Sequence, residues 1–275
     1  MSEQSMIQRA MACIREGRLP GRVQAKLEAM TDARNEKKYP AMTARLMEGI
    51  QSLPEYREVE SYCRDALAIG RNTDLSGIHF GGRDWKEKGL PTETPPYYFF
   101  LAGMARKCGA KKILEVGTWY GGSTRALWCG ANQGGTEKPH LITVDLENFD
   151  DAVFNDYPGI ERVLGDALSK ETVDRVLEKF DGEIDLLYMD GDHRYEPTRG
   201  VVEVYGNALK PKWVILDDVH YRWTMEKFWA HTLMTFGGHA YDAGTGLDIR
   251  CGEKGQGFGV IDARSIRDFT YRMNP

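Results

Sequence analysis

Between residues 112 and 218, short apolar runs alternate with segments of helical periodicity, and nearly every run is followed by an acidic residue. The strands expected from this alternation span residues 112–116, 140–144, 161–164, 184–189 and 213–216. Strands separated by helices predict an α/β fold, a doubly wound and mostly parallel sheet with helices on both faces. Ligands of such open sheets bind beyond the carboxyl ends of the strands. The acids that follow the runs are therefore expected to share one site.

The first run breaks into a glycine turn with the pattern Glu115-x-Gly117-x-x-x-Gly121, after which Ser123 or Thr124 begins a helix-like segment. Glycines let a ligand approach the backbone closely, and a helix N-terminus presents free N–H groups. Trp119 stands where a dinucleotide fingerprint would have its second glycine, which argues against a nicotinamide enzyme. The turn by itself leaves two interpretations open, a cofactor site and a plain structural turn.

Composition excludes several classes of partner. The formal net charge is −5, from 36 Lys and Arg against 41 Asp and Glu, so no basic face predicts nucleic-acid binding. No run approaches the roughly 18 apolar residues of a membrane span, and the first residues lack the apolar core of a signal peptide. The five cysteines are scattered without a Cys-x-x-Cys pair, which suits reduced thiols. We expect a soluble, cytoplasmic protein without membrane contact.

Residues 1–95 predict a helical appendage to a ligand-binding domain at residues 96–275. Apolar residues recur at helical spacing through residue 70, for example Ile7, Met11 and Ile14. Amphipathic helices outside a core need a partner surface, which favours a homo-oligomer, a dimer or higher, or a lid; a merely solvated face is the alternative. Residues 71–95 are rich in glycine, proline and polar groups, typical of a linker or of a loop that closes over a substrate. The tail after residue 237 predicts a closing hairpin at the sheet edge.

Two of the strand-end acids fit a nucleoside. Asp145 follows the second strand, where a carboxylate can accept hydrogen bonds from both ribose hydroxyls. Asp166 follows the third strand and is placed to meet an adenine edge. No Gly-x-x-x-x-Gly-Lys-Ser/Thr loop accompanies them, so a triphosphate is not expected.

Three further acids, Asp190, Asp217 and Asp218, follow the next two strands. Carboxylates without cysteine suit a hard cation with oxygen ligands, Mg²⁺ before Mn²⁺ or Ca²⁺. Adjacent like charges at a buried strand end repel each other unless a cation or a proton intervenes. For the nearby Asp192, capping of the following helix is the alternative to metal binding.

Two histidines lie beside these acids. His193 comes three residues after Asp190, within reach of a hydroxyl held by the metal, and histidine is the usual general base near neutral pH. His220, two residues after Asp218, is the competing candidate. Either histidine, considered alone, is more often a hydrogen-bonded structural residue.

In this order, the glycine turn, Asp145, Gly165-Asp166-Ala167 and the acids from Asp190 to Asp218 resemble a class I S-adenosylmethionine-dependent methyltransferase with a Rossmann-like fold. The last block is similar to metal-dependent natural-product sugar O-methyltransferases of the macrocin and mycinamicin type and to cephalosporin-hydroxylase-like relatives. The resemblance covers roughly residues 97–262. The sequence departs from it at Lys210-Pro211-Lys212-Trp213, where those proteins usually have Lys-Pro-Gly-Gly.

The resemblance implies a role for each matching position. Cofactor-binding residues would be Glu115, Gly117, Gly121, Ser123, Asp145 and Asp166; metal ligands would be Asp190, Asp217 and Asp218; the catalytic pair would be His193 and Asp190. The implied reaction is Mg²⁺-dependent transfer of a methyl group from S-adenosylmethionine to a hydroxyl of a small molecule, a sugar or other polyol of a secondary metabolite. Aromatic candidates for the acceptor wall are His79, Phe80, Trp85, Tyr221 and Trp223, with Arg222. Two alternatives are a non-catalytic S-adenosylmethionine-binding subunit and a hydroxylase-like enzyme on the same fold.

Overall fold

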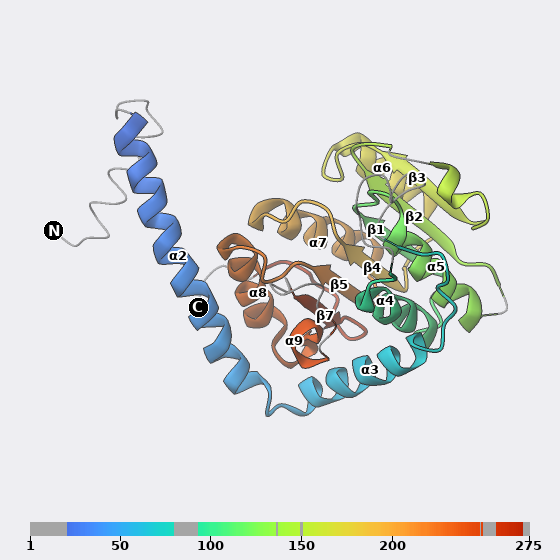
Figure 1. Cartoon of the computed structure of the whole chain (residues 1–275), viewed down its shortest axis with the longest axis horizontal. Coiled ribbons are helices and arrows are strands. Elements are labelled where there is room, and N and C mark those ends of the chain that lie inside the picture. The colour runs from blue at the N-terminus through green and yellow to red at the C-terminus, as the bar shows by residue number, and fades with distance from the viewer. Residues whose placement is uncertain are drawn as a thin grey trace.

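The computed structural model describes residues 21–79, 93–135, 137–148, 151–247, 249 and 257–271. Its centre is a seven-stranded sheet with the order β3-β2-β1-β4-β5-β7-β6 (Figure 1). The strands are β1 Lys112–Val116, β2 His140–Asp145, β3 Ile160–Leu164, β4 Leu186–Met189, β5 Trp213–Asp217, β6 Ala240–Asp242 and β7 Phe258–Asp262. Strands β1 to β5 pair in parallel, whereas β7 is antiparallel to both β5 and β6. The predicted mostly parallel sheet and the closing hairpin are confirmed.

Helices cover both faces of the sheet (Figure 1). Helices α3, α4 and α5 pack together on one side, and α6, α7 and α8 on the other. The helices are α2 Gly21–Ile50, α3 Pro54–Gly70, α4 Pro96–Lys107, α5 Gly122–Gly134, α6 Lys170–Lys179, α7 Tyr195–Leu209, α8 Trp223–Phe236 and α9 Ala243–Gly246, with 3₁₀ turns η1 Asp151–Phe154 and η2 Gly237–His239. The fold is the Rossmann-like α/β class expected from the alternation. No helix among these described elements is long and apolar enough to cross a membrane.

The central strands β1 and β4 are mainly apolar because helices bury both of their faces; the buried Glu115 of β1 is the exception. Ile113 and Leu114 of β1 and Leu186 and Leu187 of β4 are fully buried. The chain leaves β1 toward β2 and β3 in one direction, and later leaves β4 toward β5 in the other. This reversal creates a crevice at the carboxyl ends of β1 and β4, which is where open α/β sheets bind ligands.

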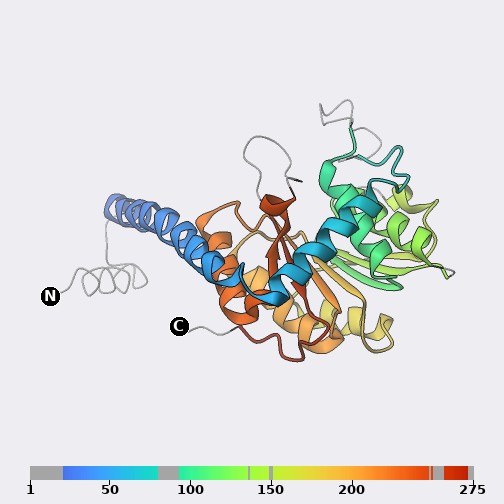
Figure 2. The ribbon, with the colours of Figure 1, turned by 90° about the horizontal axis from the view of Figure 1, so that it is seen from below.

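The predicted N-terminal helices are confirmed over α2 and α3, and the two helices are placed differently. Helix α3 belongs to the main core, since Val59, Cys63 and Ala66 are at most 1% exposed. Helix α2 extends away from the body at its N-terminal end, while its C-terminal part packs along α8 (Figures 1 and 2). Residues 1–20 and 80–92, which include Ile7, Met11, Ile14, Phe80 and Trp85, lie outside the described residues. The boundary between residues 95 and 96 stays a prediction.

Candidate active site

The glycine turn after β1 is shaped by close packing. Gly117 has a φ of +101°, and a Cβ atom there would lie 2.0 Å from the backbone oxygen of Asp190 at the end of β4. Gly121, with a φ of +73°, caps α5, and a Cβ there would lie 2.6 Å from the Phe154 ring. Only glycine adopts these conformations in so little space. Both glycines are therefore required by neighbouring protein groups as well as by any ligand.

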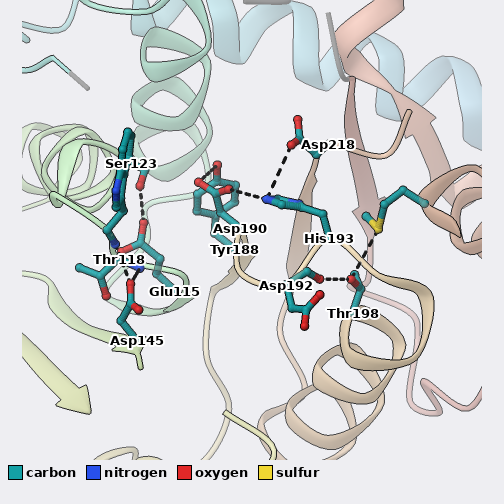
Figure 3. Close-up of polar contacts among 12 residues, drawn as sticks. Glu115, Thr118, Ser123, Asp145, Tyr188, Asp190, Asp192, His193, Thr198 and Asp218 are labelled. Carbon is teal, nitrogen blue, oxygen red and sulfur yellow. Dashed lines mark hydrogen bonds and ion pairs between the residues drawn. The ribbon is translucent and has the colours of Figure 1, made fainter. Parts of the chain in front are cut away.

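Glu115 lies beneath this turn and is completely buried. Its carboxylate accepts hydrogen bonds from the hydroxyls of Ser123 (2.7 Å), Thr143 (2.6 Å) and Thr124. Burial raises the pKa of Glu115 to about 7, although the three hydroxyl donors lower it. In this geometry Glu115 and Ser123, both predicted to contact the cofactor, face each other and fix the start of α5 (Figure 3).

Asp145 ends β2 and holds the same turn from the other side. Its Oδ2 atom accepts hydrogen bonds from the backbone N–H groups of Thr118 (2.8 Å) and Trp119 (2.7 Å) (Figure 3). These bonds fix Trp119 at a φ of 45°, a left-handed conformation that non-glycine residues adopt at a cost. Asp145, the residue predicted to bind the ribose, thus also shapes the turn.

A cavity of about 760 Å³ opens above the carboxyl ends of β1, β2, β3 and β4. Five predicted site residues line it: Gly117, Asp145, Asp166, Asp190 and His193. Its walls also include Trp119, Leu146, Ala167, Leu168, Met189, Arg194, Pro197 and Val201. Sequence reasoning missed most of these apolar walls. The available signal was an apolar residue directly after a strand-end acid, as in Asp145-Leu146, since Leu146 is 72% exposed at the cavity.

The acids after β4 and β5 meet beside this cavity, together with His193. Asp190, His193 and Asp217 each offer one ligand atom, and these atoms lie within 4.8 Å of one another. The Nε2 atom of His193 is 3.7 Å from Oδ1 of Asp190 and 3.6 Å from Oδ2 of Asp218 (Figure 3). The Tyr188 hydroxyl donates to Asp190 Oδ2 at 3.0 Å. The structure therefore brings together the four residues predicted as catalytic or metal-binding.

The electrostatics of this acid cluster, defined as Asp190, His193, Asp217 and Asp218, fit a divalent cation. Burial raises the pKa of Asp190 to about 7, and burial with the charge of Asp217 raises that of Asp218 to about 8. Burial, and then the charge of Asp190, raises the pKa of Asp217 well above its usual range. Carboxylate oxygens of Asp190 and Asp217 lie within 4.8 Å of each other, and two buried negative charges so close repel unless a proton or a cation intervenes. A cation with oxygen ligands would satisfy the same site.

Two other residues near the cluster have different partners. The Asp192 carboxylate pairs with the guanidinium of Arg194, whose Nε donates at 2.7 Å, and the Asp192 backbone oxygen accepts the Thr198 hydroxyl at 2.7 Å (Figure 3). The Asp192 carboxylate therefore pairs with Arg194 and makes no capping bond to the first N–H groups of α7. His220 lies between two carboxylates, Glu226 Oε1 at 2.7 Å and Asp242 Oδ2 at 3.0 Å.

The central part of the chain matches a known family. Residues 114–219, which include the residues that line the cavity and those of the acid cluster, match the family model described as a methyltransferase domain. The methyltransferase class expected from the sequence is thereby confirmed. A comparison with curated protein sequences found no match.

Solved structures with a similar fold include an O-methyltransferase from Bacillus cereus in complex with SAH, at 16% identity and a TM-score of 0.48, covering 74% of this chain and 90% of that one. A methyltransferase from Podospora anserina, bound to SAH, has 16% identity and a TM-score of 0.45, with 83% and 96% covered. The methyltransferase of the mycinamycin biosynthetic pathway, in complex with Mg, SAH and mycinamycin VI, has 18% identity and a TM-score of 0.35, with 56% and 39% covered.

Proposed function

We propose that the protein is a Mg²⁺-dependent O-methyltransferase that moves a methyl group from S-adenosylmethionine to a hydroxyl of a small molecule, a sugar or other polyol. The observation that carries the proposal is the single cavity shared by the nucleoside-type acids Asp145 and Asp166 and by Asp190 and His193 of the acid cluster. A nucleoside donor at one end of such a cavity would place its reactive group beside the acids at the other end.

The cofactor end of the cavity suits an adenosyl group. Asp145 uses Oδ2 for the glycine turn. Its Oδ1 accepts a long bond from the Glu147 N–H at 3.3 Å, and a carboxylate oxygen with one such bond has acceptor capacity left for a ribose hydroxyl. Leu146 and Leu168 provide exposed apolar surface against which an adenine ring can pack. Gly117 allows the backbone to approach the methionine part. Glu115, Gly121 and Ser123 would support this end from beneath.

Asp190, Asp217 and Asp218 would hold the cation. When bound, Mg²⁺ supplies positive charge that lowers the pKa of an acceptor hydroxyl. His193, which lines the cavity beside Asp190 and Asp218, would take the hydroxyl proton as the O–CH₃ bond forms and the S–CH₃ bond breaks. Burial lowers the pKa of His193, so its imidazole is neutral and able to accept a proton at pH 7. Tyr221, which is 40% exposed with its ring centroid 6.1 Å from that of His193, would form part of the acceptor wall.

To test the proposal, formation of S-adenosylhomocysteine is measured with polyols that carry neighbouring hydroxyls, with Mg²⁺ and after chelation. We expect chelation to abolish turnover and Asp217→Asn to lower it by about 100-fold, because removing a ligand weakens metal binding and activity strongly. The same change at an exposed acid on α6, Asp174→Asn, is the control and should be neutral. Full activity in chelator, or in Asp217→Asn, would contradict the metal mechanism.

The homo-oligomer and the cytoplasmic location stay predictions. Helix α2 extends from the body (Figure 2), and we infer that a second copy would pack against it. Sedimentation of the full chain would decide whether a dimer forms.

A further inference from the structure

Two acids of the cluster lie where β5 ends: Asp217 is its last residue, and Asp218 begins the turn that follows in a strained conformation. Asp218 has a φ of 55°, a left-handed region that is costly for a residue with a side chain. Val219 is fully buried, and the Tyr221 N–H donates back to the Asp218 carbonyl at 2.9 Å. Such a conformation persists only when surrounding contacts hold it. The contacts that hold this turn therefore set where Asp217 and Asp218 lie.

His220 makes these contacts with two elements that are distant in sequence. Its Nδ1 atom is 2.7 Å from Glu226 Oε1 on α8, and its Nε2 atom is 3.0 Å from Asp242 Oδ2 at the end of β6. Asp242 is itself fixed by the Thr245 N–H at 3.0 Å. Because both ring nitrogens face carboxylates, His220 has no nitrogen left to receive a proton from an acceptor. This geometry leaves His193 as the histidine that faces the acids and the cavity.

The ring of His220 is also enclosed from the side. A Cβ atom at Gly257 would lie 2.4 Å from Cδ2 of His220, and Gly257 has a φ of +85°. The backbone next to β7 thus closes over the imidazole at a distance that only glycine allows. Its two carboxylate partners and the backbone at Gly257 thus hold the His220 ring in place, so that it does not turn toward the acid cluster.

Helix α2 secures the same turn from outside. The Thr43 hydroxyl donates to Glu226 Oε2 at 3.1 Å, opposite the oxygen that pairs with His220. The Trp223 indole N–H donates to Asp32 Oδ1 at 3.1 Å, and Tyr39 stacks on Trp223 with ring centroids 6.1 Å apart. Contacts from α2 therefore support both the partner of His220 and the far end of the turn.

We propose that His220 is a positioning residue for the acid cluster: its pairing with Glu226 and Asp242, supported by α2, fixes the Asp217–Asp218 turn at the spacing from Asp190 and His193 that cation binding requires. This inference rests on the proposed function, because it concerns the same cluster. It also gives α2 a role. A helix that only covered the surface would not need contacts with the turn and its partner Glu226.

The test compares Mn²⁺ binding, followed by calorimetry, in the full-length protein and in His220→Gln. We expect the dissociation constant for Mn²⁺ to rise by about 10-fold or more, as for other residues that orient metal ligands. The affinity for S-adenosylhomocysteine should stay unchanged, since Asp145 and Asp166 lie at the other end of the cavity. The matched control is His231→Gln on α8, whose imidazole bonds Tyr195 at 2.7 Å and touches no acid of the cluster.

A second variant keeps the inference testable if His220→Gln fails to fold. Thr43→Val removes one hydrogen bond to Glu226 and should weaken Mn²⁺ binding in the same direction by about 2- to 5-fold, the effect of losing one hydrogen bond of modest strength. Where His220→Gln is active, its methyl-transfer rate should still fall on the acid side of the pH–rate profile, because His193, which accepts the proton, is still present.

The outcomes separate the two proposals. Normal Mn²⁺ binding by wild type together with unchanged binding by His220→Gln and Thr43→Val would overturn the positioning role and leave the proposed function intact. Absence of any Mn²⁺ binding by wild type would overturn both. Loss of the acid-side fall in rate in His220→Gln would show that His220 is the base and would also overturn the inference.

Discussion

Gly117 and Asp190 meet backbone to backbone at the point where the strand order reverses. The sequence alone predicts that Gly117 serves the cofactor, while the chemistry belongs to acids several strands later. The structure couples the two sites, because a methyl group on Gly117 would lie 2.0 Å from the Asp190 carbonyl oxygen and 2.8 Å from the Gly191 nitrogen. At this residue, a change made to the proposed cofactor site therefore also displaces Asp190, a proposed metal ligand.

Gly117→Ala is therefore expected to weaken both S-adenosylhomocysteine and Mn²⁺ binding, because relief of the overlap must shift the end of β4. Gly182→Ala is the matched control: Gly182 has a φ of +78°, but a Cβ there meets nothing within 4 Å. Gly182→Ala should lower the free energy of unfolding by only about 1 kcal/mol, because alanine is strained in the left-handed conformation, and should leave both affinities unchanged. Both ligand affinities are measured by calorimetry, and a loss confined to the cofactor would show that the sites are independent.

At the scale of elements, the crossing of α3 and α4 decides how the N-terminal region joins the body. A Cβ on Gly70 would lie 1.7 Å from the Phe99 carbonyl oxygen, and one on Gly103 would lie 1.8 Å from the Ala66 carbonyl oxygen. The two helix backbones are thus in direct contact through small residues. The periodicity of α3 predicts a helix but does not reveal this partner. Helix α3 is consequently as much a part of the core as α4.

Gly103→Ala should destabilise the protein by more than about 3 kcal/mol, above the usual cost of overpacking, because backbone atoms cannot move aside as side chains do. The same change at Gly49 of α2, where a Cβ meets nothing within 4 Å, should stabilise by about 0.5–1 kcal/mol through the higher helix propensity of alanine. Urea unfolding of both variants measures the difference. Equal free energies of unfolding for the two variants would refute the close crossing.

For the whole molecule, buried acids dominate the dependence of stability on pH. Burial raises the pKa of Glu115 and Asp190 to about 7, and burial with the charge of Asp217 raises that of Asp218 to about 8, against unfolded values near 4. At pH values between the unfolded and the folded pKa of these groups, the folded chain binds more protons than the unfolded chain. The free energy of unfolding therefore falls as pH rises. His220 also lowers the free energy of unfolding as pH rises above about 6.5, because it holds its proton longer in the folded chain than in the unfolded chain. Although burial alone lowers the pKa of His220, its bonds to Asp242 and Glu226 raise the value to about 10.

We expect the free energy of unfolding, measured with chelator present, to drop by at least about 2 kcal/mol between about pH 5.5 and pH 8. Mg²⁺ should restore stability at the higher pH and have little effect at the lower, because protonated carboxyl groups do not bind it. Asp217→Asn should remove most of the Mg²⁺ response. A wild-type stability that rises over this range would contradict the assignment of raised pKa values.

The sequence by itself determined the sheet, the helices and the edge at which the site lies. Periodicity and turn residues are local, and the carboxyl ends of parallel strands necessarily share one edge, so Asp145, Asp166, Asp190 and Asp217 could be grouped without coordinates. Only the tertiary structure decided what each side chain faces. Glu115 faces three hydroxyls and His220 faces two carboxylates, and most of these partners come from other elements. Contacts between distant segments depend on packing in three dimensions, which no local pattern records.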